Sequence, residues 1–162
     1  MAIRGATTDD IEGIRRVARQ SWRTDYPEIL SRETAEEAVE EWYDPDRLEE
    51  EIESTDALIA VFETVDGDIG GFAQIVWDAQ TGTVLRLYVA PDHRGRGIGT
   101  DLLTWTVDAL ADRDVERVRA LVLSENEPGN AFYRSFGFEK TGEGRTTIGD
   151  DAYRENTYSM PV

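Results

Sequence analysis

The spacing of hydrophobic residues changes along this chain, and the change predicts where helices give way to strands. In the first fifty residues apolar positions recur every three or four residues, which is typical of amphipathic helices. Thr8 or Asp9 is predicted to cap the first helix, because Glu12 follows Asp9 at the spacing of a capping box. Pro27 and Pro45 are expected to interrupt the helical pattern. The predicted buried positions are Ile11, Ile14, Val17, Ala18, Trp22, Ala35, Ala38, Val39 and Trp42.

Beyond residue 56 the pattern changes to short runs of β-branched and apolar residues, which are typical of strands. With a short edge strand at residues 2–6, the predicted strands lie at residues 57–62, 71–77, 83–90, 115–123, 142–148 and 153–162. The first three of the longer strands follow one another through turns, so we expect them to be antiparallel. A helix separates strands 83–90 and 115–123, and we therefore expect these two to be parallel, with a right-handed crossover.

The segment 83–110 combines a strand, a glycine-rich turn and a helix. The turn, Arg94–Gly99, has three alternating glycines that leave the first backbone N–H groups of the following helix uncovered, with two arginines beside them. Unpaired amides and the positive end of a helix dipole favour a bound phosphate. From the glycines alone, a tight turn with solvated arginines is an equally good interpretation.

The spacing excludes two other kinds of nucleotide-binding loop. A dinucleotide-binding turn needs a further glycine where this chain has Thr100 or Leu102. A P-loop needs a Gly-Lys-Ser/Thr sequence, and the single lysine of the chain is Lys140.

The composition predicts one domain, residues 1–162, without thiol or histidine-cluster chemistry. The chain has no cysteine and one histidine, so we expect no metal site. A formal charge of −17 opposes binding to nucleic acid or to an anionic membrane, and we interpret it as a halophilic-type acidic surface that favours solubility. Without a long apolar run or a signal-peptide pattern, the protein is expected to be soluble and cytoplasmic.

Two sequence signatures resemble those of the GCN5-related N-acetyltransferase (GNAT) family. Arg94–Gly99 is similar to the family's Arg/Gln-x-x-Gly-x-Gly/Ala motif, and the likeness extends upstream through Leu87-Tyr88-Val89. The segment Asn126–Phe138 matches the second signature, Asn-x-x-x-x-Ala-x-Tyr-x-x-x-Gly-Phe, at every fixed position. It is also predicted to be a short helix, with Pro128 in its first turn and Gly137 at its end.

The resemblance implies a three-layer α/β (α+β) fold, in which a mostly antiparallel mixed sheet of about seven strands has a splayed parallel pair and about four helices flank it. It implies acetyl-CoA as cosubstrate, with the pantetheine arm along Leu87, Tyr88 and Val89. The pyrophosphate would lie on the loop, which comprises Arg94, Gly95, Arg96, Gly97, Ile98, Gly99 and Thr100.

Two further residues receive roles from the resemblance, and each has a simpler structural interpretation. Asn126 is expected to hydrogen-bond the coenzyme arm, whereas by position alone it would cap a helix. Tyr133 is expected to be the general acid that protonates the departing thiolate. By periodicity alone Tyr133 would be a core aromatic residue beside Phe132 and Phe136.

The resemblance implies acetyl transfer to a primary amine of a small molecule, by direct attack in a ternary complex. A protein N-terminal or lysine acetyltransferase and a non-catalytic acyl-CoA-binding regulatory module remain alternatives. Homodimer formation is an expectation from the family.

The acceptor side is left open by the sequence. Many family members carry a glutamate base at inner strand positions that this chain fills with Arg86, Leu87 and Leu121. The remaining candidates for the base are Glu125, Glu63, Asp78 and a water molecule. Four aromatic residues are candidates for lining an acceptor pocket: Trp22, Tyr26, Trp42 and Tyr43. A role in the hydrophobic core is the favoured interpretation of all four.

Overall fold

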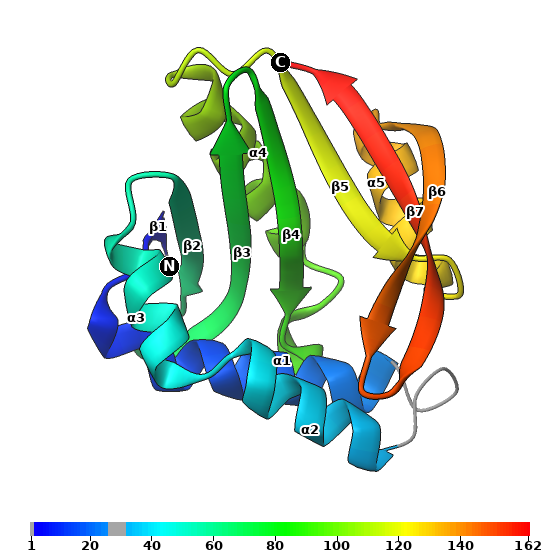
Figure 1. Ribbon diagram of the computed structural model, residues 1–162. Coiled ribbons are helices and arrows are strands. Elements are labelled where there is room, and N and C mark those ends of the chain that lie inside the picture. Colours follow the sequence, from blue (N-terminus) through cyan, green and yellow to red (C-terminus); the bar gives the residue numbers. More distant parts are fainter. Residues whose placement is uncertain (1, 26–31) are drawn as a thin grey trace.

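The computed structural model describes residues 2–25 and 32–162, which build a seven-stranded mixed sheet between two layers of helices (Figure 1). The sheet has the order β1-β2-β3-β4-β5-β7-β6, and only β4 and β5 are parallel. Its strands are β1 (Ala2–Gly5), β2 (Ala57–Glu63), β3 (Ile69–Asp78), β4 (Thr81–Val89), β5 (Arg117–Leu123), β6 (Glu139–Ile148) and β7 (Asp151–Pro161). This confirms the predicted fold class, including the parallel pair.

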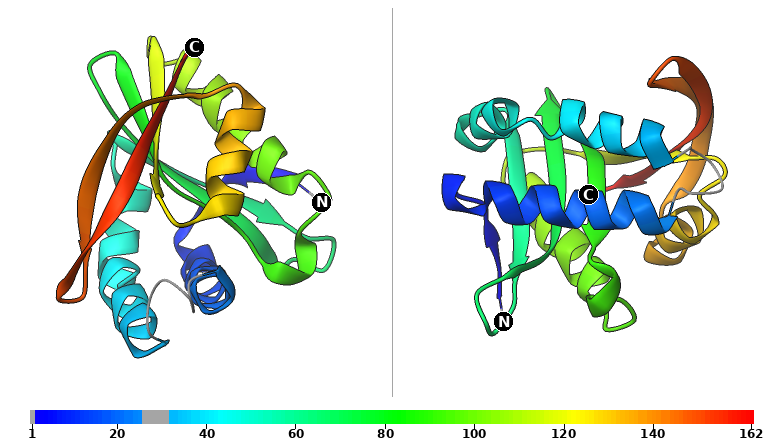
Figure 2. Two further views of the ribbon diagram at one scale, coloured as in Figure 1. Left: turned by 90° about the vertical axis from the view of Figure 1, so that its right-hand side faces the viewer. Right: turned by 90° about the horizontal axis from the view of Figure 1, so that it is seen from below.

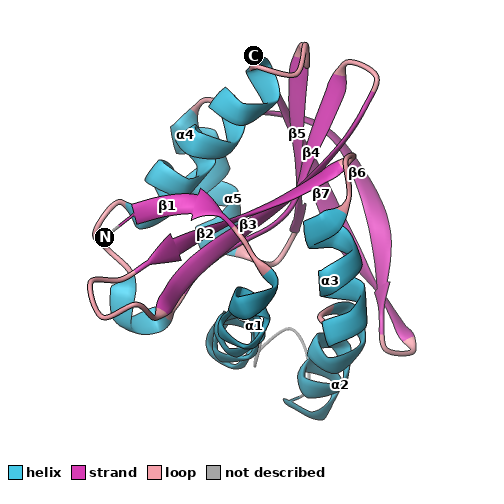
Figure 3. Ribbon diagram, turned by 90° about the vertical axis from the view of Figure 1, so that its left-hand side faces the viewer, coloured by secondary structure: helices cyan, strands magenta, loops and turns pink. Residues whose placement is uncertain are grey.

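The described residues form five α-helices, where about four were expected, and two short 3₁₀ helices. They are η1 (Thr8–Asp10), α1 (Ile11–Asp25), α2 (Arg32–Trp42), α3 (Pro45–Glu53), η2 (Pro91–His93), α4 (Ile98–Ala111) and α5 (Glu127–Phe136). Helices α1, α2 and α3 cover one face of the sheet, and α4 and α5 cover the other (Figures 2 and 3). Within the described residues, no helix is long and apolar enough to span a bilayer.

The periodic apolar positions of α1 and α2 pack against the sheet as predicted. Ile14, Val17 and Trp22 are buried in a cluster that also contains Val39 and Phe72. The side chain at position 35, also predicted to be buried, lies outside the described part of the structure. On the opposite face, α4 approaches β4 so closely that a Cβ atom on Gly82 would lie 2.7 Å from a Leu110 methyl carbon.

A β-bulge in β4 changes which side chains face each helix layer. In the β3–β4 ladder Ile75 is opposite Val84 and Gln74 is opposite Arg86, so Leu85 is the extra residue. Val84 packs in the core under α4, whereas Arg86 faces α2. Val84 and Arg86 are two residues apart and would share a face in a regular strand. The bulge at Leu85 places them on opposite faces of the sheet.

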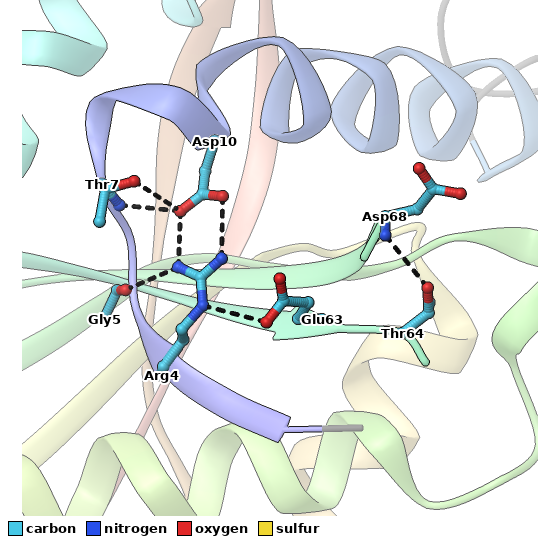
Figure 4. Close-up of polar contacts among 7 residues, drawn as sticks. All are labelled: Arg4, Gly5, Thr7, Asp10, Glu63, Thr64 and Asp68. Atoms are coloured by element: carbon cyan, nitrogen blue, oxygen red, sulfur yellow. Dashed lines mark hydrogen bonds and ion pairs between the residues drawn. The ribbon is translucent and has the colours of Figure 1, made fainter. Parts of the chain in front are cut away.

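The start of α1 differs from the prediction. The N-cap is Thr7, and its backbone N–H donates to Asp10 Oδ2 at 2.8 Å, so the cap precedes η1 instead of lying at Thr8 or Asp9. The predicted cap was wrong because the buried carboxylate of Asp10 binds Arg4 on β1 as well as the Thr7 N–H. The apolar pattern of α1 gives no sign of that partner. Arg4 donates to both oxygens of Asp10, at 2.7 and 3.1 Å, and to Glu63 at 3.3 Å (Figure 4). This network joins β1, β2 and the beginning of α1.

We expect Asp10→Asn to lower the free energy of unfolding at pH 7 by about 2 kcal/mol, because it weakens charge-assisted bonds to a buried carboxylate. The hydrogen bond with Arg4 lowers the pKa of Asp10 below its usual value. The stabilisation is therefore complete above the pKa of an unfolded aspartate and is lost as the pH falls through the lower folded-state pKa. Urea denaturation at several pH values measures the difference, which should disappear in acid. The control is Asp9→Asn, at the exposed neighbouring position. An equal loss of unfolding free energy in both variants would show that the Asp10–Arg4 network does not stabilise the fold.

Candidate active site

A cleft of about 420 Å³ lies where β4 and β5 separate. The parallel ladder pairs residues 81–84 with residues 117–120 and ends there, and the two strands then diverge (Figure 1). The cleft is bordered by β4 residues 85–89 and by β5 residues 121–123. The β4 edge that faces β5 is thus available to a ligand over the segment that contains Leu87, Tyr88 and Val89.

The glycine-rich turn lies next to this cleft, at the beginning of α4. Gly95 and Gly97 have left-handed backbone conformations, with φ of 78° and 80°, and Gly97 is the N-cap of the helix. These conformations strain residues that carry a Cβ atom, which explains why glycine occupies both positions. The Nε atom of Arg94 donates to the Val89 carbonyl at 2.9 Å and so ties the turn to the end of β4.

The predicted loop residues have different environments. Arg94 and Gly99 line the cleft, whereas Arg96 and Ile98 border a separate cavity of about 580 Å³ beside β2. Ile98 is the first residue of α4, and its side chain is largely buried in a cluster with Phe62 and Leu102. Gly95, Gly97 and Thr100 are exposed and are not among the lining residues of either cavity.

Asn126 caps α5 and also lines the cleft. Its Oδ1 atom accepts the Gly129 N–H at 3.1 Å, which confirms the capping role. A Cβ atom on Gly129 would lie 2.7 Å from Asn126 Nδ2, so glycine is needed for this close packing. The side-chain amide therefore has a fixed position at the mouth of the cleft.

The buried side chain of Asn130 connects α5 to both neighbouring strands, and sequence reasoning did not single it out. Its Nδ2 group donates to the Asn126 and Leu123 carbonyls at 2.7 and 3.1 Å. Its Oδ1 atom accepts bonds from the Tyr158 hydroxyl at 2.7 Å and the Asn156 amide at 2.9 Å. A polar residue on the inner face of α5 was the one signal available in the sequence.

Tyr133, one helical turn after Asn130, is both a core residue and a wall of the cleft. Its ring is 7% exposed and stacks on Tyr158 with centroids 6.2 Å apart. Burial raises the pKa of the Tyr133 hydroxyl above its usual value, which already lies well above neutral pH. A neutral phenol in this position can donate a proton.

The opposite wall of the cleft is built from aromatic residues and one cation. Trp22 donates through Nε1 to the Tyr88 hydroxyl at 3.0 Å and packs edge-on against Trp42 at 5.3 Å. The Arg86 guanidinium lies 4.3 Å from the centre of the Trp42 ring. Trp22 and Trp42 therefore contribute both to the core and to the cleft.

Of the other two predicted acceptor-side aromatics, only Tyr43 belongs to the described residues, and it does not line the cleft. Tyr43 is buried against Phe72, at 5.8 Å between ring centres. Tyr26 lies outside the described residues.

None of the three acids considered for a base lines the cleft. Glu63 pairs with Arg4 (Figure 4), and Glu125 and Asp78 are exposed and do not line the cleft. Of the described residues, the carboxylate that lines the cleft is Glu155 on β7. The pKa of Glu155 is raised by partial burial, with the charge of Arg86 opposing the rise. The β5–β7 register, which pairs Glu155 with Leu123, brings this side chain to the cleft. A sequence pattern does not determine that register.

The described residues contain no group of three or more His, Cys, Asp or Glu side chains that could hold a metal ion. What they do bring together is an anion-binding helix start, a protonated phenol and a carboxylate around one cleft. This arrangement suits transfer of a group from a phosphate-bearing donor to an acceptor, with proton transfer on each side.

Comparisons with known proteins show which families and structures this chain resembles. The model of the acetyltransferase (GNAT) family matches residues 16–138. A spermidine N(1)-acetyltransferase of Thermoplasma acidophilum is 29% identical over 159 residues, which cover 96% of each chain. A streptothricin acetyltransferase of Streptomyces lavendulae is 36% identical over 92 residues, 56% of this chain and 49% of that protein.

Among solved structures, the PaiA N-acetyltransferase of Thermoplasma acidophilum, crystallised in complex with coenzyme A, superposes with a TM-score of 0.83. It is 29% identical, and the alignment covers 97% of this chain and 98% of that one.

We expect Asn130→Ala to lower the free energy of unfolding by about 3 kcal/mol, because it leaves the buried hydroxyl of Tyr158 and the amide of Asn156 without their shared acceptor. Urea denaturation monitored by fluorescence measures the loss. The matched control is Ser135→Ala, an exposed position of the same helix, which should change stability by less than about 0.5 kcal/mol. Equal stability of the two variants would show that the network is dispensable.

Proposed function

This chain belongs to the acetyltransferase (GNAT) family and is an N-acetyltransferase, and we propose that it moves the acetyl group of acetyl-CoA to a primary amine of a small molecule. The observation that carries the proposal is the two-sided cleft between β4 and β5. The turn that begins α4, together with Tyr133 on α5, borders one side. Arg86 and the tryptophans of α1 and α2 border the other.

Coenzyme A would bind on the side of α4 and α5. The uncovered N–H groups at the start of α4 and the guanidinium of Arg94 are suited to its pyrophosphate. The free edge of β4 over residues 87–89 can pair with the amides of the pantetheine arm, as an added strand would. Asn126 would supply a further side-chain bond at the mouth of the cleft.

In the proposed reaction, a neutral amine attacks the thioester carbonyl carbon directly in a ternary complex. The C–N bond forms and the C–S bond breaks, and the departing thiolate takes a proton from the hydroxyl of Tyr133. Tyr133 lines the cleft, and a tyrosine hydroxyl carries its proton at neutral pH, so a proton donor is present beside the bound coenzyme.

A small acceptor is supported by the form of the acceptor side. Trp22, Trp42 and Arg86 form a closely packed wall there, and the cleft volume of about 420 Å³ lies at the scale of small-molecule sites. The similarity over 96% of both chains to an enzyme named for spermidine N-acetylation also supports a small amine as acceptor.

The test is thiol release from acetyl-CoA in the presence of an amine panel that contains spermidine, amino acids, an aminoglycoside, and peptides with a free N-terminus or a lysine. Turnover with a small amine and none with the peptides is the expected result. Turnover confined to peptides would indicate a protein acetyltransferase instead. Coenzyme A binding by calorimetry without any turnover would indicate a non-catalytic binding module.

We expect Gly97→Ala to weaken coenzyme A binding by about tenfold, because a Cβ in the left-handed region costs about 1–2 kcal/mol and distorts the first turn of α4. Calorimetric titration with coenzyme A measures the affinity. Gly144→Ala is the control, since Gly144 lies on β6 with open space around the added Cβ. Unchanged affinity in Gly97→Ala would remove the turn from the coenzyme site.

We expect Tyr133→Phe to lower kcat by about 100-fold or more, the scale of general acid catalysis, while the Kd of coenzyme A changes by less than about threefold. The phenyl ring preserves the packing on Tyr158, so the loss would belong to the hydroxyl. Tyr153→Phe removes a hydroxyl on β7 that does not line the cleft and should leave kcat unchanged. An unchanged kcat in Tyr133→Phe would rule out the role.

A further inference from the structure

We infer that Glu155 is the catalytic base that takes the proton from the acceptor ammonium group, an inference that rests on the proposed function. An alkylamine is protonated at neutral pH and cannot attack a carbonyl carbon until it loses a proton. The reaction therefore needs a proton acceptor on the side of the cleft where the amine enters.

The strand register places Glu155 on that side. Glu155 is opposite Leu123, the last residue of β5, and directly paired residues share a face of the sheet. Leu123 packs in the cluster under α1 and α2, which also contains Trp22. Glu155 thus faces the helix layer of Trp22 and Trp42, whereas Tyr133 comes from the helix layer on the other face.

Within residues 2–24 and 36–162, whose side chains the structure describes, no other acid is among the residues that line the cleft. Glu51 accepts a short hydrogen bond from Gln74 and does not line the cleft among the described residues. The inner strand positions beside the cleft carry Arg86, Leu87 and Leu121, none of which can accept a proton at neutral pH. Glu155 is left as the carboxylate in contact with the cleft.

The surroundings of Glu155 suit a base. Its partial burial raises the pKa of the carboxyl group toward the working pH, where a proton acceptor is most effective. The charge of Arg86 opposes this rise and favours the ionised form, which is the form that can receive a proton. A negative side chain at this position also attracts the cationic amine.

The protons of the reaction balance with these two groups. The carboxylate of Glu155 takes one proton from the ammonium group, and the amine nitrogen then forms the C–N bond. As the C–S bond breaks, Tyr133 gives its proton to the thiolate. The second proton of the nitrogen leaves the amide product and restores Tyr133 through solvent. One proton is released in total, from Glu155.

The family comparison did not point to this residue. The family model matches residues 16–138, and Glu155 lies beyond that range, in the terminal β6–β7 hairpin. The hairpin contributes Thr146 and Ile148 to the same cleft. We therefore attribute to the hairpin a part in catalysis as well as in closing the sheet.

The test compares Glu155→Gln with wild type, using spermidine or the best amine of the panel as acceptor. At pH 7 we expect kcat/KM to fall by about 100-fold, and the Kd of coenzyme A to stay within about threefold. Without its base the variant depends on the neutral fraction of the amine, so its kcat/KM should rise about tenfold per pH unit from pH 7 up to the pKa of the acceptor, which is about 10 for an alkylamine and about 8 for an α-amino group. The wild-type profile should be much flatter. Of the described residues, the other titratable groups that line the cleft are Arg86, Tyr88, Arg94 and Tyr133.

Glu139→Gln provides the matched control, because Glu139 is an exposed carboxylate of the same hairpin. It should keep the wild-type rate and pH profile. A Glu155→Gln variant with the wild-type rate, or with a loss that is the same at every pH, would overturn the role of Glu155 and leave the proposed function intact. Wild-type protein that turns over no amine would overturn the proposed function and this inference together.

Discussion

The parallel pairing of β4 and β5 ends after four residue pairs, and the rest of the site depends on this early ending. Leu85, the first residue beyond the paired segment, is also the bulge in the β3–β4 ladder. A bulge adds a residue to one strand and bends it, so β4 turns away from β5 at the same point. The resulting gap exposes backbone edges in the middle of a sheet, where a continuous ladder would leave none.

A gap through the sheet connects two helix layers that the sheet would otherwise separate. The bulge also sets the face of each later residue: Arg86 meets α2, while Leu87 and Val89 pack with Leu102 of α4. Proton donor and proton acceptor can therefore come from opposite layers and meet a substrate from two sides. The hydrogen bonds of Asn130 hold α5 against β7, so one buried amide fixes the distance between the elements that carry Tyr133 and Glu155.

The parts predicted from the sequence are those that local rules control. The apolar stripe of α1, the cap at Asn126, and the strand, turn and helix around Gly97 follow from periodicity and turn chemistry. The contributions of Asp10 and Glu155 depend on partners 6 and 32 residues away, Arg4 and Leu123, which only the tertiary structure brings near. The bulge at Leu85 has no glycine or other local signal, so the sequence predicted a regular strand there.

The cation at position 86 explains why the base would come from β7. The guanidinium of Arg86 lies over the ring of Trp42 at one of the inner strand positions beside the cleft, and it would repel an incoming ammonium group. The carboxylate of Glu155 lines the same cleft and offsets the charge of Arg86. The charge of Arg86 in turn favours the ionised form of Glu155. Because the cleft is partly buried, this local balance is screened by salt far less than the long-range field of the acidic surface. The selectivity for a cationic acceptor would then depend on Glu155 and Arg86 and hardly at all on the net charge of −17.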